Sequence, residues 1–334
     1  MDRLNVGLFN DSFPPTIDGV AQAVKNYADV LHRNHCDVTV VTPEYKGVRD
    51  EYPFEVFRYQ SIPLDHRIGY RAGNPFNPET LIRLLGRFGD ALAEAGRHAD
   101  AALVLGGDGA MLGAARALAD LSIPLLGVNF GKVGFLAEVP AEDWRPWLEA
   151  LFAGEFHEER HTALVWRVLR PGADTAASGR AVNDVVVARG QVARAVSLDL
   201  SVDGVFLSRL RCDGLIVSTP LGATAYSASS GGPLAFPTLD AHIVTAVSPF
   251  AGAFPPLVLP AATPVTLTAS GDNDDVHLTV DGQESLPLKT GDLIEVRGVP
   301  GVVPLLVRDP RWYLRRLGRR GFILPGPGHY APPR

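Results

Sequence analysis

The sequence lacks the residues and patterns that mark several large classes of protein. Its 334 residues include only two cysteines, Cys36 and Cys212, at a spacing that matches no metal-ligand pattern. This favours free thiols in a reducing compartment over a disulfide-built fold. No apolar run approaches the roughly 18 residues of a membrane-spanning helix. The opening residues Asp2 and Arg3 are not typical of a secretion signal. We therefore expect a cytoplasmic protein with no membrane partner.

Positive charge is scarce as well. The chain has 31 Lys and Arg against 37 Asp and Glu, a formal net charge of -6. Proteins that bind nucleic acid through bulk electrostatics carry an excess of positive charge, so we expect no nucleic-acid partner. Small anionic ligands remain compatible with this balance, because they need only a local site. The length predicts two domains, and a hydrophobic fraction of 46% is ordinary for a globular protein.

Strand-like and helix-like patterns alternate along the first part of the chain. Short apolar runs predict strands over residues 4–9, 37–41, 101–105 and 124–128. Apolar residues at helical spacing predict helices over residues 20–32, 79–97 and 110–121. Residues 50–78, rich in Pro, Tyr and Arg, are expected to be irregular. This alternation predicts an α/β unit with a parallel, Rossmann-like sheet.

The pattern changes after a further helix predicted over residues 144–152. Runs such as 197–202 and 276–280 alternate apolar and polar side chains, which is typical of half-buried strands. Asp-Gly pairs at 203–204 and 281–282 have the composition of tight hairpin turns. A second, mostly antiparallel β domain is therefore predicted. The predicted division is an α/β domain over residues 1–142, a β-rich domain over 143–300, and a C-terminal segment over 301–334 that returns to the first domain and ends in a loose tail.

A glycine-rich turn follows the strand predicted over residues 101–105. Gly106, Gly107 and Gly109 surround Asp108, and a helix is predicted directly after them. Glycine allows a ligand to approach the backbone closely, and the first N–H groups of a helix attract anions. The turn therefore suits phosphate binding, although its spacing matches neither the P-loop nor the dinucleotide fingerprint. A tight turn capped by an aspartate is an alternative interpretation.

The carboxylate of Asp108 favours the functional interpretation. Phosphates repel a neighbouring carboxylate, which suggests that this one has a function of its own. A metal ion could neutralise it, or it could accept a hydrogen bond from a hydroxyl that attacks phosphorus. Phosphoryl transfer depends more on positioning than on strong basicity, so an ordinary aspartate is a sufficient acceptor. We therefore expect the glycines to hold the donor's phosphates and Asp108 to orient the acceptor hydroxyl.

Several segments resemble, in order, the motifs of the NAD kinase family. They are the GGDG turn at 106–109, the second glycine-rich segment at 127–136, the Asn-acid motif at 182–186, the long signature at 213–233, and the segments 281–283 and 311–315. The resemblance covers about residues 98–318 and implies a two-domain NAD kinase-like fold. It implies phosphorylation of the adenosine-ribose 2′-hydroxyl of NAD to give NADP, with ATP or polyphosphate as donor. It also implies Mg²⁺ arriving with the nucleotide, and a homo-oligomer in which a neighbouring subunit helps to build the site.

By the same resemblance Asp108 is the proton acceptor, and residues of the later motifs bind the nucleotides. The implied binding residues are Gly109, Asn183, Asp184, Arg194, Arg211, Asp213, Thr224, Ala225, Tyr226, Ser227, Ser229 and Gln283. The chemistry agrees, because an asparagine suits a purine edge or a ribose and an arginine suits a pyrophosphate. A structural interpretation stands beside each role, such as a turn asparagine, a solvated strand arginine or a tyrosine packed between the domains. No metal-ligand residue is predicted, and His161 and His277 are expected to be structural.

Two positions depart from the family pattern. Ala223 stands where the family usually has a serine, which removes one hydroxyl. The segment 248–254 lacks polar residues that often occur there. Both departures are expected to change nucleotide affinity without removing the chemistry.

The opening of the chain resembles a different family. Segments 6–15, 18–20, 38–43 and 70–76 resemble the N-terminal domain of retaining nucleotide-sugar glycosyltransferases. This part spans residues 4–80, and its predicted junction with the kinase-like body lies near residues 75–85. If the opening strands did not dock beside the strand at 101–105, the kinase body would expose a sheet edge and would be unstable.

Three hypotheses follow for function. An NAD kinase is the first, a catalytically dead module that holds NAD is the second, and a glycosyltransferase-derived fragment is the third. A related lipid kinase is disfavoured because the 183–184 and 224–226 segments indicate a dinucleotide. Formation of NADP from NAD separates the first hypothesis from the others.

Overall fold

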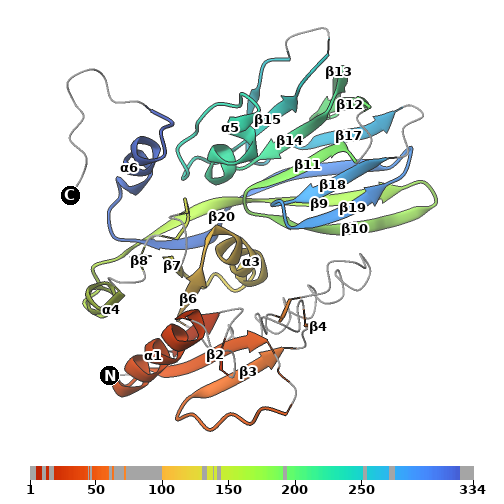
Figure 1. Ribbon diagram of the computed structural model, residues 1–334. Helices are drawn as coiled ribbons and strands as arrows, with labels where there is room; N and C mark the ends of the chain where they lie inside the picture. The colour runs from red at the N-terminus through yellow and green to blue at the C-terminus, as the bar shows by residue number, and fades with distance from the viewer. Residues whose placement is uncertain are drawn as a thin grey trace.

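The computed structural model describes most of the chain. The described residues are 5–9, 13–14, 19–43, 45, 47–59, 62–63, 71–72, 100–129, 134–137, 139–140, 144–190, 194–250, 254–270 and 275–323. The helix predicted over residues 79–97, part of the second glycine-rich segment (130–133) and the tail after residue 323 lie outside them. Figure 1 shows the α/β unit, coloured red to yellow, below the β-rich unit, coloured green to blue.

The first unit is built on a parallel sheet, as predicted. Its strands β1 (Asn5–Phe9), β2 (Asp37–Pro43), β6 (Ala101–Gly106) and β7 (Leu125–Asn129) take the spatial order β7-β6-β1-β2. β1 pairs with β6 in parallel, from Val6 opposite Ala101 to Phe9 opposite Val104. The opening strands therefore dock directly beside the strand that precedes the GGDG turn, and the instability expected for an undocked opening does not apply.

One strand lies where irregular structure was expected. β3 (Glu55–Tyr59) pairs in parallel with β2, with Thr39 opposite Glu55, and extends the sheet. The expectation for residues 50–78 is wrong here because pairing with β2, rather than local composition, decides the conformation of so short a segment. β4 (Ile62–Pro63) and β5 (Arg71–Ala72) form a separate antiparallel pair.

The helices of this unit pack as their apolar spacing predicts. One face of α1 (Gly19–Arg33) is buried against β1 and β2 through Val24, Tyr27 and Leu31. α3 (Asp108–Leu118) starts earlier than predicted, so that Asp108 is its first residue. β8 (Val139–Pro140) pairs with β7, and α4 (Trp144–Phe152) forms where it was predicted.

The second unit consists of two antiparallel sheets packed face to face. One sheet contains β11 (Asp184–Arg189), β14 (Gly214–Ser218), β15 (Ala241–Val247), β16 (Leu257–Pro260), β18 (Val276–Val280) and β19 (Glu284–Leu288). The other contains β9 (His157–Arg170), β10 (Ala173–Ala181), β12 (Val196–Val202), β13 (Val205–Cys212), β17 (Val265–Ser270) and β20 (Leu293–Val307). Val185 and Leu215 of the first sheet share one core with Leu198 and Ile294 of the second.

The hairpin turn predicted at 203–204 is confirmed. Asp203 and Gly204 connect β12 to β13 with φ of 50° and 76°, the left-handed conformation that a tight hairpin requires. A short 3-10 helix, η2 (Leu221–Thr224), and α5 (Tyr226–Ser229) follow β14.

β20 joins the two units. It pairs antiparallel with β9 and β17, and Leu305 pairs in parallel with Leu125 of β7, so one sheet extends from β13 to β3. β20 crosses residue 300, where a division was predicted. After it, α6 (Trp312–Arg319) buries Trp312 and Leu317 in the same apolar cluster as α3. The predicted division into domains stays a prediction.

Among the described helices, none combines the length and the apolar composition that a bilayer crossing demands.

Candidate active site

Asp108 occupies the junction between β6 and α3. β6 is buried along its first five residues, and the glycines after it let the chain turn directly into the helix. The N-terminal N–H groups of α3 begin at this turn, with the positive end of the helix dipole. The GGDG turn therefore has the geometry expected of an anion-binding site.

Three consecutive backbone amides hold the carboxylate of Asp108. The N–H of Phe135 donates to Oδ2 at 2.5 Å, and the N–H groups of Leu136 and Ala137 donate to Oδ1 at 2.9 and 3.4 Å. A Cβ added to Gly134 would lie 1.9 Å from Asp108 Oδ1, so only glycine fits there. The two glycine-rich motifs of the sequence thus meet at one carboxylate, in an arrangement that we call the Asp108 cradle.

Gln283 connects the start of α3 to the β-rich unit. Its Nε2 donates to the carbonyl oxygen of Gly109 at 2.8 Å, and its Oε1 accepts from Arg116 at 2.8 Å. Arg116 also forms ion pairs with Asp281 at 2.6 Å and with Glu284 at 3.1 Å. The β18–β19 turn is therefore fixed to both the first and the last turn of α3.

Asp281 forms a second cradle of the same kind. Its Oδ1 accepts from the N–H groups of Val182, Asn183 and Asp184 at 3.0, 2.7 and 3.1 Å. Its side chain is fully buried, and its φ of 50° is a conformation that Asp tolerates better than most residues. This Asp281 cradle fixes the backbone of the Asn-acid motif relative to α3.

Asp184 is buried beside this second cradle. It is 4% exposed, and burial, together with the nearby carboxylate of Asp281, raises the pKa of Asp184 to about 7. The family resemblance places this acid against a ribose, whereas the structure buries it. Asn183 is half-buried and lies closer to solvent.

The long signature packs against Asn183. The N–H of Thr219 donates to the carbonyl oxygen of Asn183 at 2.8 Å, and a Cβ on Gly222 would lie 2.2 Å from that same oxygen. Beyond this contact Tyr226 and Ser229 are exposed, whereas Ser227 is buried with its hydroxyl 3.1 Å from that of Thr245. Thr224 and Ala225 are half-buried. The structure thus brings the Asn-acid motif and the 219–229 loop together.

A second group of predicted binding residues, Arg194, Arg211 and Asp213, lies near the opposite end of β11. β11 begins at Asp184 and ends at Arg189, which places its two ends about 17 Å apart at the usual rise of a strand. At the far end Arg189 pairs with Asp213 at 2.9 Å, and the guanidinium of Arg211 lies 5.5 Å from the ring centre of Phe250. Arg194 is exposed just before β12, which pairs with β13 at this same end.

The two histidines predicted to be structural lie in different places, and His277, paired with Ala188, lies beside the second group. His161 is fully buried with Nδ1 3.1 Å from the carbonyl oxygen of Pro237, and burial lowers its pKa. His277 contacts Asp275 at 3.2 Å, and both cysteines are free and buried. Within the described part of the chain, no cluster of three or more His, Cys, Asp or Glu could hold a metal ion.

Sequence reasoning missed Asp281 and Arg116. The segment 281–283 resembles a family motif and its Asp-Gly pair predicts a turn, but neither signal assigned a contact to Asp281, and Arg116 has the appearance of an ordinary solvated helix residue. Their ion pair joins residues 165 positions apart, so no local signal could have revealed it.

Comparison with known families covers both units. The ATP-NAD kinase N-terminal domain matches residues 18–156, and the ATP-NAD kinase C-terminal domain matches residues 182–305. An NAD kinase of Nitratidesulfovibrio vulgaris (strain DSM 19637 / Miyazaki F) is 48% identical over 243 residues, which is 72% of this chain and 86% of the relative. The chain belongs to the NAD kinase family.

Further members of the NAD kinase family agree in sequence and fold. The NAD kinase of Lawsonia intracellularis (strain PHE/MN1-00) is 39% identical over 68% of this chain and 79% of the relative. A yeast NADH kinase solved with NADH has a TM-score of 0.73 at 20% identity, over 100% of this chain and 91% of that one. An NAD kinase from Archaeoglobus fulgidus solved with ATP has a TM-score of 0.62 at 22% identity, over 96% and 100%. The two-domain NAD kinase-like fold predicted from the sequence is confirmed.

The two cradles lie within these NAD kinase matches. Asp108 and residues 134–137 fall in the N-terminal match, and residues 182–184 and Asp281 fall in the C-terminal one. The N-terminal match begins at residue 18, inside the opening segment. The comparisons do not show the glycosyltransferase resemblance of residues 4–80, which stays a prediction. α6 lies beyond the C-terminal match.

Proposed function

We propose that this protein is an NAD kinase that transfers a phosphoryl group to the adenosine-ribose 2′-hydroxyl of NAD and so forms NADP. Membership of the family supports the activity. The observation that carries the assignment of the site is the hydrogen-bonded path from Gly109 through Gln283, Arg116 and Asp281 to the amide of Asn183. This path holds a glycine-rich anion site and a ribose- or purine-binding motif at fixed separation.

Asp108 is the proposed acceptor of the hydroxyl proton. A carboxylate has about four acceptor positions. In the cradle Oδ1 receives two amides and Oδ2 receives one, which leaves one position on Oδ2 for a substrate hydroxyl. Because Asp108 is half-buried, that position is accessible to a ligand. The cradle fixes the direction in which the remaining acceptor position points.

The dinucleotide is proposed to bind along the Asn-acid motif and the 219–229 loop. The backbone groups of Asn183 are engaged by Asp281 and Thr219, so its side-chain amide is the part available to a purine or ribose. Tyr226, 44% exposed, offers a ring for stacking, the hydroxyls of Thr224 and Ser229 offer polar atoms near it, and Ala225 contributes its backbone. Asp184 is buried next to Asn183 in the chain, and the buried hydroxyl of Ser227 holds the loop through Thr245.

The proposed phosphate donor is ATP or polyphosphate, and Mg²⁺ enters with it. The ATP found with the Archaeoglobus fulgidus enzyme supports ATP, and the NADH found with the yeast enzyme supports a nicotinamide dinucleotide as acceptor. When bound, Mg²⁺ supplies neutralisation of phosphate charge. A module that binds NAD without phosphorylating it is the second candidate, and the same assay distinguishes it.

The second group of predicted residues is proposed to serve a neighbouring subunit of a cytoplasmic homo-oligomer. Arg194, Arg211 and Asp213 lie near the Arg189 end of β11, about one strand length from the end that begins at Asp184. Arg211 lies on β13, which is an edge strand, and at the opposite end of that strand Val205, Phe206 and Leu207 are 45–61% exposed. An exposed apolar edge of this kind is typical of a contact between chains.

A double substitution tests the proposed oligomer. We expect the mass from light scattering to exceed that of one chain, and V205S/F206S to lower it towards that of one chain. L314S, which changes an apolar residue 55% exposed on α6, is the matched control and should leave the mass unchanged. A monomeric wild-type protein would contradict the proposal.

The function is tested with the purified protein, NAD, Mg²⁺ and either ATP or polyphosphate. NADP is measured with an NADP-specific dehydrogenase in a cycling assay, and NAD binding is measured by calorimetry. NADP formation supports the kinase. Binding of NAD without NADP from either donor would favour the non-catalytic module, and absence of both would reject the proposed site. A glycosyltransferase origin of residues 4–80 remains a proposal about ancestry only.

A further inference from the structure

A side chain from α6 reaches the Asp108 cradle from the side opposite to Asp108. Arg316 is 9% exposed, and its guanidinium donates to the carbonyl oxygens of Phe135 and, at 3.2 Å, of Ala137. The amides of these same residues hold Asp108. The loop over residues 135–137 is therefore bound on one side by a cation and on the other by a carboxylate.

One peptide group connects the two charges directly. The carbonyl of Phe135 and the N–H of Leu136 belong to the same peptide unit. Arg316 binds the oxygen of this unit, and its N–H donates to Asp108 Oδ1 at 2.9 Å. Hydrogen bonds at both ends of a peptide polarise it in the same sense and strengthen each other. Arg316 therefore strengthens the contact that orients Asp108 without touching Asp108 itself.

α6 holds Arg316 rigidly. The guanidinium carbon of Arg316 lies 4.9 Å from the ring centre of Trp312, and Trp312 Nε1 donates to Glu159 at 2.9 Å. Tyr313 and Leu317 are buried in the cluster that also contains Met111 of α3. The planar, multiply donating guanidinium suits two carbonyls of one loop, which a single lysine ammonium would satisfy less well.

A contribution to stability alone does not explain why the buried guanidinium of Arg316 lies beside the loop over residues 135–137. Burial of a charge costs free energy, and an apolar residue of similar volume is often equally stable or more stable in such a position. The neighbours of Arg316 include Met111, Leu136 and Trp312, which would accommodate an apolar side chain. The contact is therefore better explained by the geometry that it imposes on the loop.

We propose that Arg316 is a positioning residue of the phosphoryl transfer, which acts on Asp108 through the Phe135–Leu136 peptide. The inference rests on the proposed function. It adds a third segment of the chain to the Asp108 cradle, from beyond the part that matches the family's C-terminal domain.

The first test compares R316M and R316K with R315M. Arg315 is the adjacent residue of the same helix, 57% exposed and paired with Asp309 at 2.7 Å, so R315M is a matched control. We expect R316M to lower kcat about ten- to hundredfold, because a small misplacement of a reacting group is costly. KM for NAD should stay within about threefold, since Asp108 orients a bound hydroxyl rather than binding NAD. R316K should recover part of kcat, and R315M should match the wild type.

The second test separates positioning from a general loss of structure. In the D108N background R316M should lower the residual rate by less than about twofold, because residues that act through one group are not additive. Amide exchange of residues 134–137 should accelerate about tenfold in R316M, while exchange in β6 and α3 stays at the wild-type rate.

Unchanged kcat in a folded R316M, independent losses in the double variant, or unchanged exchange at 134–137 would each overturn the inference. If R316M does not fold, R316K and R316Q take its place under the same criteria. A wild-type protein that forms no NADP would reject the proposed function instead, and the exchange measurement would then decide the positioning role alone.

Discussion

The Asp108 cradle and the Asp281 cradle have the same hydrogen-bond geometry but different roles. Each is an aspartate that accepts N–H groups from three consecutive residues, 135–137 in one case and 182–184 in the other. Asp281 receives an arginine directly on its carboxylate, whereas Asp108 meets its arginine only through a peptide group. The Asp281 side chain is fully buried, and Asp108 is half-buried.

This difference distinguishes Asp281, which has a structural role, from Asp108, which can accept a hydrogen bond from a substrate. Oδ1 of Asp281 receives three amides, and Oδ2 receives Arg116 and a further amide contact from Val182, so no acceptor position is left. Asp108 retains one position and access to solvent. A carboxylate held by backbone amides is therefore informative about function only when its remaining acceptor capacity is counted.

The largest expected difference between the two cradles is the loss of turnover when Asp108 is replaced. D108N preserves the size of the side chain and removes its ability to accept a proton. We expect NADP formation to fall about 10²- to 10⁴-fold, the usual contribution of a positioned acid–base group. The dissociation constant for NAD and the melting temperature should change little. Turnover equal to that of the wild type would contradict the role of Asp108.

D281N should act mainly on stability. It leaves Arg116 without its buried counter-charge, which typically costs about 3 kcal/mol of unfolding free energy. Urea denaturation measures this loss, and D108N should show much less of it. The double variant R116M/D281N removes both charges and is expected to recover part of the loss. If the double variant were as unstable as the sum of the single ones, the ion pair would not be the cause.

The smallest expected effect concerns the pH dependence of stability around Asp184. Its folded pKa of about 7 lies above the unfolded value of 3.8, so its protonated form is favoured by folding. The stabilisation is complete below pH 3.8 and disappears as the pH rises through 7. Relative to the wild type, D184N should therefore gain about 2 kcal/mol of unfolding free energy between pH 5 and pH 7.

Denaturation of the two proteins at both pH values measures the Asp184 effect. S218A, which changes the buried cross-strand neighbour of Asp184, is a control that does not titrate and should give the same difference at both values. A difference between D184N and the wild type that does not change with pH would show that Asp184 is not protonated by burial.

Much of the fold could be predicted because its signals are local. The α1 stripe, the GGDG turn before α3 and the hairpin at Asp203 each lie within a few residues of sequence. β3 was missed because its five residues have no pattern of their own and form a strand only by pairing with β2. The continuity of β20 across residue 300 was equally hidden, since Pro300 and Gly301 lie within the strand and usually indicate its end.

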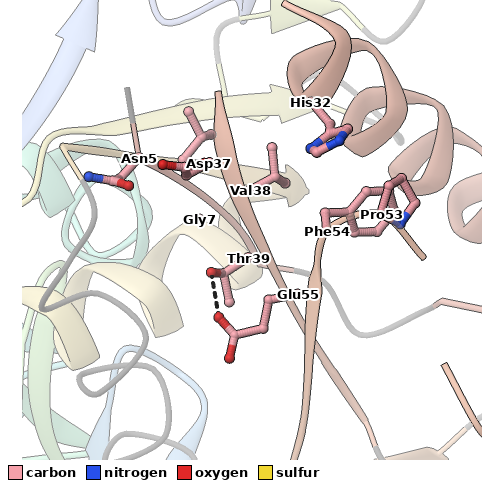
Figure 2. A pocket seen from close by; sticks show the side chains of 10 residues that line it. Asn5, Gly7, His32, Asp37, Val38, Thr39, Pro53, Phe54 and Glu55 are labelled. Atoms are coloured by element: carbon pink, nitrogen blue, oxygen red, sulfur yellow. Dashed lines mark hydrogen bonds between the residues drawn. The ribbon is translucent and has the colours of Figure 1, made fainter. Parts of the chain in front are cut away.

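The site could be predicted only as a set of residues. Asn183 and the 219–229 loop do meet, as adjacent motifs of a binding site should. The burial of Asp184, the separation of Arg211 and Asp213 from Asp184 along β11, and the cradle around Asp281 depend on contacts between distant segments. The cavity of about 310 Å³ at the start of β1–β3, lined by Asn5, Asp37 and Thr39 and shown in Figure 2, was also not foreseen and lies apart from both cradles.

The amides that hold Asp108 belong to the main chain, and this has an evolutionary consequence. Nearly every replacement at positions 135, 136 or 137 preserves the N–H that the acid requires, so drift at these positions is tolerated as long as packing is. Only proline there, or a side chain at Gly134, would interfere directly. Selection on this part of the enzyme is therefore expected to act on Asp108, Gly134 and Arg316, which lie far apart in the sequence. A comparison that scores only neighbouring positions would underestimate this selection.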